Sequence, residues 1–146
     1  MSYDSPFLIA FRTDASINIG LGHVMRCLTL ADAFAKDGAK CHFLCRDLPG
    51  HLAEVIERRG HSVTLLPAPS SPEAASGDTD SPDAPCMFLS GVTLEEEITQ
   101  SFEILESLMP SRLIVDHYGL DARWEINAVP SDVPVMVIDD LANRSH

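Results

Sequence analysis

The chain has 146 residues, of which 45% are hydrophobic and 22% are charged, a composition typical of a single soluble globular domain. Its formal net charge of −12 at pH 7 argues against nucleic acid or an anionic membrane as a partner. No apolar run approaches the ~20 residues that a transmembrane helix needs, and no signal-peptide pattern precedes the first apolar run. The four cysteines lack Cys-x-x-Cys spacing, so we expect reduced thiols in a cytoplasmic protein with neither a metal nor a cofactor.

A short apolar run at residues 8–11 predicts a buried strand, and a polar loop with two glycines follows it. From Gly22, apolar residues recur every three or four positions, which predicts a helix that ends near Asp37 with Gly38 as its stop. His23 lies in the first turn of this helix, where the positive helix N-terminus disfavours a charged imidazolium. A neutral ring there can accept a proton, so His23 is a candidate general base, although a histidine at a helix start is more often a surface or capping residue.

Two features of the same helix start limit what the loop can bind. The loop is not the dinucleotide fingerprint, because Met25 stands where that motif needs its third glycine. Arg26 follows His23 by three residues and could pair with a phosphate or a carboxylate.

The next part of the chain alternates between strand and helix patterns. Residues 39–45 and 62–66 predict strands, and residues 51–59 between them predict a helix. This order implies a parallel sheet with right-handed crossovers. Residues 67–92 are rich in proline, serine and aspartate, which predicts a mobile loop that is either a substrate-side lid or a tolerated insertion without function.

Thr93 and Glu96 form a capping box that begins the next predicted helix. Its expected buried face comprises Ile98, Phe102, Leu105 and either Leu108 or Met109. A strand at residues 112–115, a helix at 120–129 and a strand at 134–138 complete the pattern. Asp139 and Asp140 follow the last strand, and without a third carboxylate nearby in sequence we expect them to be structural rather than metal ligands.

Asp116, His117, Tyr118 and Gly119 follow the strand at 112–115 and form a second polar loop. In parallel sheets, ligands bind beyond the carboxyl ends of the strands, so this loop and the loop before His23 should share one edge. His117 is either a second acid–base group or a hydrogen-bonded loop histidine. The predicted fold is therefore Rossmann-like: an α/β domain with a mostly parallel sheet and helices on both faces.

Three motifs carry a resemblance to a known family. The first is Arg-x-Asp-x-Ser-x-x-Ile-Gly-x-Gly-His-x-x-Arg-Cys-Leu at residues 12–28. The second is Ile-Val-Asp-His-Tyr-Gly-Leu-Asp at 114–121, followed by Trp124-Glu125, and the third is Val-Ile-Asp-Asp-Leu-Ala-Asn-Arg at 137–144. In this order they resemble the UDP-sugar hydrolases of pseudaminic acid biosynthesis and related spore-coat polysaccharide proteins, which are similar to two-domain GT-B glycosyltransferases.

The resemblance implies hydrolysis of a UDP-linked diacetamido-trideoxy sugar to UDP and free sugar, with His23 as the general base. It assigns substrate binding to Asp14, Gly20, Gly22, Arg26 and Tyr118, and supporting roles to Arg12, Ser16, Asp116 and His117. It also implies that residues 1–146 are the N-terminal domain, and that a C-terminal nucleotide-binding domain, absent from this sequence, would pack against it.

Two other functions remain open at this stage. A glycosyltransferase would use the same loop to activate an acceptor hydroxyl instead of water. Alternatively, the chain would be a non-catalytic half-domain that binds a sugar or a partner.

Overall fold

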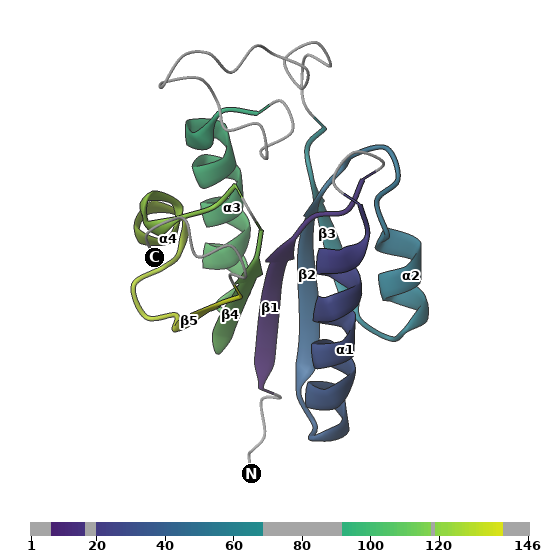
Figure 1. The fold of residues 1–146 in the computed structure, drawn as a ribbon. Coiled ribbons are helices and arrows are strands. Elements are labelled where there is room, and N and C mark those ends of the chain that lie inside the picture. The colour runs from purple at the N-terminus through teal and green to yellow at the C-terminus, as the bar shows by residue number, and fades with distance from the viewer. Residues whose placement is uncertain (1–6, 17–19, 69–91, 118, 139–146) are drawn as a thin grey trace.

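The computed structural model describes residues 7–16, 20–68, 92–117 and 119–138. Strands and helices alternate along these residues (Figure 1), in the following order: β1 (Leu8–Thr13), α1 (Gly22–Lys36), β2 (Lys40–Arg46), α2 (Ala53–Arg58), β3 (Ser62–Leu66), α3 (Leu94–Leu108), β4 (Arg112–Asp116), α4 (Ala122–Ala128) and β5 (Val135–Val137). The predicted elements are all present, and their boundaries agree with the predicted ones to within about two residues.

The five strands form one sheet in the order β3-β2-β1-β4-β5, and every neighbouring pair is parallel. β1 lies at the centre, where Phe11 is opposite Phe43 of β2 and Ile114 of β4. The chain adds β2 and β3 on one side of β1 and then crosses to add β4 and β5 on the other. The strand order therefore reverses between β1 and β4, and this switch point is where ligands bind in open α/β sheets.

Helices cover both faces of the sheet, as predicted. Figure 1 shows α1 and α2 on one side of the strands and α3 and α4 on the other. Two apolar cores correspond to these faces: Phe11 and Ile114 pack with α1 and α2 residues, whereas Ala10 and Leu113 belong to the core that contains Trp124 of α4. The alternation of neighbouring strand residues between the faces recurs in the site described below.

Local chemistry sets the helix ends where the sequence indicated. Gly38 follows α1 with φ +96°, a left-handed conformation that glycine adopts without steric cost. At the start of α3, the Thr93 side chain accepts a hydrogen bond from the Glu96 backbone N–H, and the Glu96 carboxylate accepts one from the Thr93 backbone N–H. The predicted capping box is therefore confirmed.

The predicted buried face of α3 is partly wrong. Leu105 is fully buried, and Ile98 and Leu108 pack against the core, as predicted, with Met109, the alternative to Leu108, exposed. Phe102, however, is 37% exposed. Glu97 and Ser101 are buried instead, on the same helical face as Leu105. The physical reason is that guanidinium groups lie beneath this part of α3, so the helix presents a carboxylate and a hydroxyl to them rather than an apolar surface.

Three of the four cysteines, Cys27, Cys41 and Cys45, are buried free thiols, and burial raises the pKa of Cys27 to about 12 and that of Cys41 to about 11. Within the described ranges, no group of side chains has the composition of a metal site, and no helix is long and apolar enough to cross a membrane. Cys86, the paired carboxylates Asp139 and Asp140, and residues 69–91 of the predicted loop lie outside the described residues.

Candidate active site

The first component of the site is the turn that leads into α1. The Gly20 backbone N–H donates to the Ser16 carbonyl over 2.8 Å, and Gly20 has φ +89°, which favours glycine at this position. Helix α1 then begins at Gly22, so His23 lies in its first turn. The His23 side chain is only 10% exposed. Exposed hydrophobic side chains, Leu21 and Met25, are its near neighbours in sequence.

The second component is Asp116, at the end of β4. It is opposite Thr13 in the parallel register between β1 and β4, so it lies at the switch point of the sheet. His23 Nδ1 is 2.6 Å from Asp116 Oδ1, although 93 positions separate the two residues in the sequence. The prediction that the two polar loops share one edge is confirmed by this contact.

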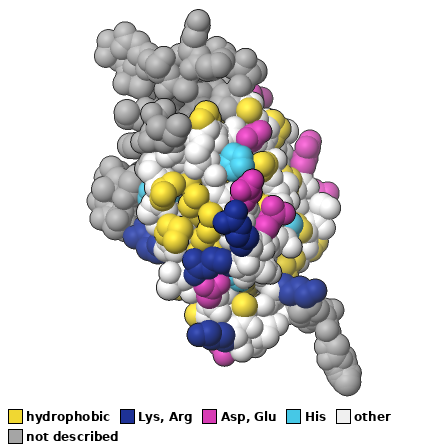
Figure 2. All heavy atoms as spheres, turned by 90° about the vertical axis from the view of Figure 1, so that its right-hand side faces the viewer, with side chains coloured by type: hydrophobic (Ala, Val, Ile, Leu, Met, Phe, Trp, Pro, Cys, Tyr) yellow, Lys and Arg dark blue, Asp and Glu magenta, His cyan; other side chains and the backbone are white. Residues whose placement is uncertain are grey.

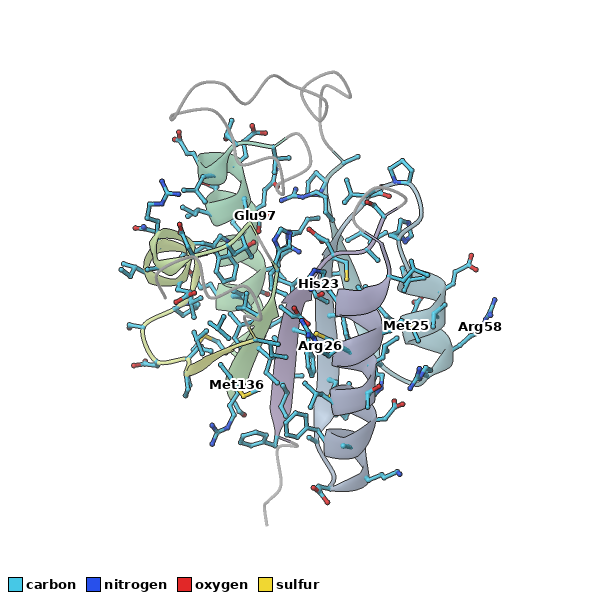
Figure 3. All side chains as sticks on the ribbon, in the orientation of Figure 1. His23, Met25, Arg26, Arg58, Glu97 and Met136 are labelled. Atoms are coloured by element: carbon cyan, nitrogen blue, oxygen red, sulfur yellow. The ribbon has the colours of Figure 1, made fainter. Side chains whose placement is uncertain are left out.

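Arg26 completes the cluster from the next turn of α1 (Figure 3). Its Nε donates to Asp116 Oδ2 and its Nη2 donates to Oδ1, each over 2.7 Å, in a bidentate pair. Burial alone would raise the pKa of Asp116, but the hydrogen bonds from His23 and Arg26 outweigh it and lower the pKa. Asp116 is therefore a carboxylate at neutral pH, and Arg26 pairs with a carboxylate, one of the two partners expected for it.

This geometry determines which nitrogen of His23 can accept a proton. A charged carboxylate only accepts hydrogen bonds, so the Nδ1 that faces Asp116 carries a hydrogen. Nε2 then carries the lone pair of the neutral ring. A histidine held in this way by a carboxylate has the orientation and tautomer of a general base, and the carboxylate stabilises the positive charge that forms on the ring.

A second polar cluster lies around Asp14, on the other face of the sheet. Asp14 Oδ1 accepts from Arg12 Nη1 over 2.7 Å and from the Arg46 backbone N–H over 2.6 Å. Asp14 Oδ2 accepts from His117 Nε2 over 2.7 Å. Burial would raise the pKa of Asp14, but Arg12 and His117 hold it well below its usual range. Both carboxylate oxygens of Asp14 thus bind protein groups.

Glu97 of α3 is the centre of this second cluster (Figure 3). Oε1 accepts from Arg12 Nη2 over 2.7 Å and also binds Arg46 Nη2. Oε2 accepts from Arg12 Nε over 2.9 Å, from Ser101 Oγ over 2.6 Å and from Trp124 Nε1 over 3.2 Å. The carboxylate and both guanidiniums are fully buried. Glu97 therefore ties α3 and α4 to the carboxyl ends of β1 and β2.

The pleat of the strands explains why two clusters form. Asp116 reaches α1, whereas its neighbour His117 reaches Asp14 on the opposite face. His117 Nδ1 accepts from the Gly119 backbone N–H over 2.9 Å, while Nε2 donates to Asp14. The bonds to His117 are those expected for a hydrogen-bonded loop histidine, the second of the two alternatives.

The structure describes all but one of the remaining candidate site residues named in the sequence analysis. Arg12, Asp14 and Ser16 are buried, and Gly22 is exposed at the start of α1. Tyr118 lies outside the described residues.

The molecular surface on the side of α1 and α2 has charged side chains of both signs interspersed, with hydrophobic side chains gathered in one part of it (Figure 2).

Sequence reasoning missed Glu97 and Arg46. The sequence did indicate that a buried carboxylate was needed, because Arg12 and Arg46 lie in or directly after apolar runs that were expected to be buried strands. A buried guanidinium requires a buried carboxylate. Glu97 precedes Ser101 and Leu105 by four and eight residues, which places it on one helical face with them.

Comparison with known proteins adds no assignment to this geometry. A scan of protein-family models and a search of curated proteins both find no match for the chain.

Proposed function

We propose that this chain is the catalytic domain of a UDP-sugar hydrolase that acts on a UDP-linked amino-deoxy sugar, with His23 as its general base. The observation that carries the proposal is the 2.6 Å contact between His23 Nδ1 and Asp116 Oδ1 at the switch point of the sheet. The sugar and its nucleotide follow from the resemblance in residues 12–28 and 114–121. The three buried free thiols favour a reducing, cytoplasmic compartment.

In the proposed reaction, His23 Nε2 takes a proton from a water molecule as the water oxygen attacks the linkage between sugar and UDP. If the water oxygen bonds to the sugar carbon, UDP leaves with the electron pair of the broken carbon–oxygen bond. If it bonds to phosphorus, the sugar leaves with the electron pair of the broken phosphorus–oxygen bond. Asp116 holds the Nδ1 hydrogen throughout and stabilises the imidazolium that forms. General-base assistance of this kind contributes about 10²–10⁴-fold to a rate.

Substrate contacts in this proposal come from the loop before α1 and from a second domain. Gly20 has no side chain, and a Cβ placed on it or on Gly22 would meet no atom of the other described residues within 4 Å, which favours approach of a ligand to the backbone of this turn. A C-terminal domain of the GT-B kind would hold the nucleotide opposite this edge.

The test is release of UDP from a UDP-linked diacetamido sugar, measured for the chain and for His23→Ala and Asp116→Asn. We expect both substitutions to reduce turnover by about 10²-fold or more while the circular dichroism spectrum is kept.

His61→Ala is a matched control for the loss of a buried histidine. His61 is also buried and also bonded to a carboxylate, with Nε2 2.9 Å from Asp32 Oδ1. Asp32 lies toward the C-terminal end of α1, about 14 Å along the helix from His23. The control pair is therefore remote from the proposed site, and His61→Ala should keep its turnover.

Turnover that persists in His23→Ala would contradict the catalytic role of His23. UDP release that requires an added acceptor would indicate glycosyl transfer instead of hydrolysis. Reaction in ¹⁸O-labelled water identifies the broken bond: label in the UDP product indicates cleavage at phosphorus, and UDP without label indicates cleavage at the sugar carbon.

A further inference from the structure

The carboxylate of Asp116 is shared by two groups that can both carry a positive charge. His23 Nδ1 and Arg26 Nη2 both bind Oδ1, over 2.6 Å and 2.7 Å, and Arg26 Nε binds Oδ2 over 2.7 Å. The Asp116 side chain is fully buried, and that of Arg26 is 39% exposed. The cluster thus contains one fixed negative charge, one fixed positive charge and one histidine that can change its charge.

We infer that Arg26 is a positioning residue of the His23–Asp116 pair: its two hydrogen bonds fix the Asp116 carboxylate, and this carboxylate holds the His23 ring in the orientation in which Nε2 can accept a proton. This inference rests on the proposed function, because it concerns the proposed general base. It differs from the role that the resemblance implies for Arg26, which is to bind substrate.

The geometry gives the physical reason. Arg26 and Asp116 form a bidentate pair, the strongest geometry for an arginine and a carboxylate, and this pair fixes the plane of the carboxylate. Asp116 Oδ1 binds both Arg26 Nη2 and His23 Nδ1, so the carboxylate that Arg26 fixes is the group that orients the ring. Without Arg26, the carboxylate could rotate and the His23 ring would lose its fixed orientation.

Other described groups near the pair do not fix the Asp116 carboxylate in this way. On the α1 side of the sheet, Thr13 is uncharged, and the thiol of Cys27, 3.9 Å from Asp116 Oδ2, has a pKa that burial raises to about 12. His117, which follows the last residue of β4, bonds to Asp14 on the opposite face. Among the residues that the structure describes, Arg26 is thus the permanently charged group bonded to Asp116.

The orientation of Arg26 also bears on the substrate-binding alternative. Two of its three side-chain nitrogens, Nε and Nη2, donate to Asp116 and form one edge of the guanidinium. A diphosphate that used this edge would have to displace the Asp116 carboxylate. Removal of a substrate ligand should change KM, whereas removal of a positioning residue should change kcat.

The experiment is NMR of the Nδ1–H proton of His23 in the full chain, without substrate, with the signal identified by its absence in His23→Ala. In Arg26→Met we expect this proton to exchange with water about tenfold faster, because the carboxylate to which it donates is no longer fixed. Arg26→Lys, which keeps the charge but not the bidentate geometry, should restore only part of the protection. Arg58→Met is the control, because Arg58 lies on α2, away from His23, and is 76% exposed (Figure 3).

Exchange that stays the same or slows in Arg26→Met would overturn the inference. In the hydrolysis assay, Arg26→Met should lose about tenfold or more in kcat and keep its KM. A raised KM with an unchanged kcat would overturn the inference in favour of a substrate ligand. Because the NMR measurement needs no turnover, failure of the inference can be distinguished from failure of the proposed function.

Discussion

Replacement of Glu97 with glutamine should destabilise the fold by about 3–5 kcal/mol, the cost of removing one partner of a buried ion pair. The Glu97 carboxylate accepts hydrogen bonds from Arg12, Arg46, Ser101 and Trp124, and all four of these side chains are buried. Glutamine preserves the size of the side chain, so the loss reports charge and hydrogen bonding rather than a cavity.

The magnitude follows from the charges and donors around the carboxylate. Arg12 and Arg46 carry two positive charges, which Asp14 and Glu97 balance, so Glu97→Gln leaves one buried positive charge without a counter-ion. The substitution also turns one acceptor oxygen into an NH₂ group that faces N–H or O–H donors. The expected cost is a large part of the about 5–15 kcal/mol by which a typical domain is stable.

Acid should reproduce part of this loss in the unchanged chain. Burial would raise the pKa of Glu97, but the charges of Arg12 and Arg46 and the hydrogen bond from Arg12 outweigh it and lower the pKa from 4.5 to about 2. A carboxyl group whose pKa is lower in the folded state stabilises the fold above its unfolded pKa, and this stability is lost as the pH falls toward the folded value. The contribution of Glu97 should therefore disappear between pH 4.5 and about 2, and Glu97→Gln should lack it.

The assay is urea unfolding at pH 7, followed by circular dichroism and by the fluorescence of Trp124, the only tryptophan. With an m value of about 2 kcal/mol per M, a loss of about 4 kcal/mol lowers the midpoint by about 2 M. The control is Glu103→Gln, an exposed site on the same helix, which should change the free energy of unfolding by less than about 0.5 kcal/mol. A loss below about 1 kcal/mol in Glu97→Gln would refute the reasoning.

Three further predictions concern single residues. Thr93→Ala should cost about 1 kcal/mol in the free energy of unfolding, because the capping box at the start of α3 loses its side-chain acceptor; an unchanged urea midpoint would contradict this. Gly20→Val should destabilise by about 1 kcal/mol or more, and Gly20→Asn by less, because φ is +89° there and no atom of the other described residues lies within 4 Å of an added Cβ; equal midpoints for the two variants would show that the backbone is not the cause. Cys27 should react with iodoacetamide at pH 8 only when the chain is unfolded, since its thiol is buried and its pKa is raised to about 12; peptide mapping after alkylation of the folded chain is the check.

The sequence was sufficient for the fold because its signals are local. The helical spacing after Gly22, the stop at Gly38 and the Thr93 capping box each depend on a few neighbouring residues, and the alternation of strands and helices then limits the topology to a parallel sheet. This topology was enough to place His23 and Asp116 at one edge of the sheet. It was not enough to predict the contact between their side chains, because that contact depends on the register between β1 and β4.

The second cluster shows what local patterns omit. Glu97 was not identified because an acidic residue in a helix with a capping box resembles any other solvated residue near a helix start. Its burial depends on Arg12 and Arg46, which are distant in sequence, and the hydrophobic period of α3 therefore led to Phe102 instead. His117 illustrates the same limit: adjacent loop residues were grouped together, although the pleat directs Asp116 and His117 to opposite faces of the sheet.

The position of Glu97 in the chain has a consequence for the order of folding. Strands β1 and β2 contain Arg12 and Arg46, and both strands precede α3 in the sequence. Until α3 arrives, these strands hold two arginines with Asp14 as the one carboxylate bonded to them among the described residues. The core with α1 and α2 lies on the opposite face and can close without burying these arginines. The face that α3 covers is thus expected to stay open during synthesis until a single acidic side chain arrives to balance its charge.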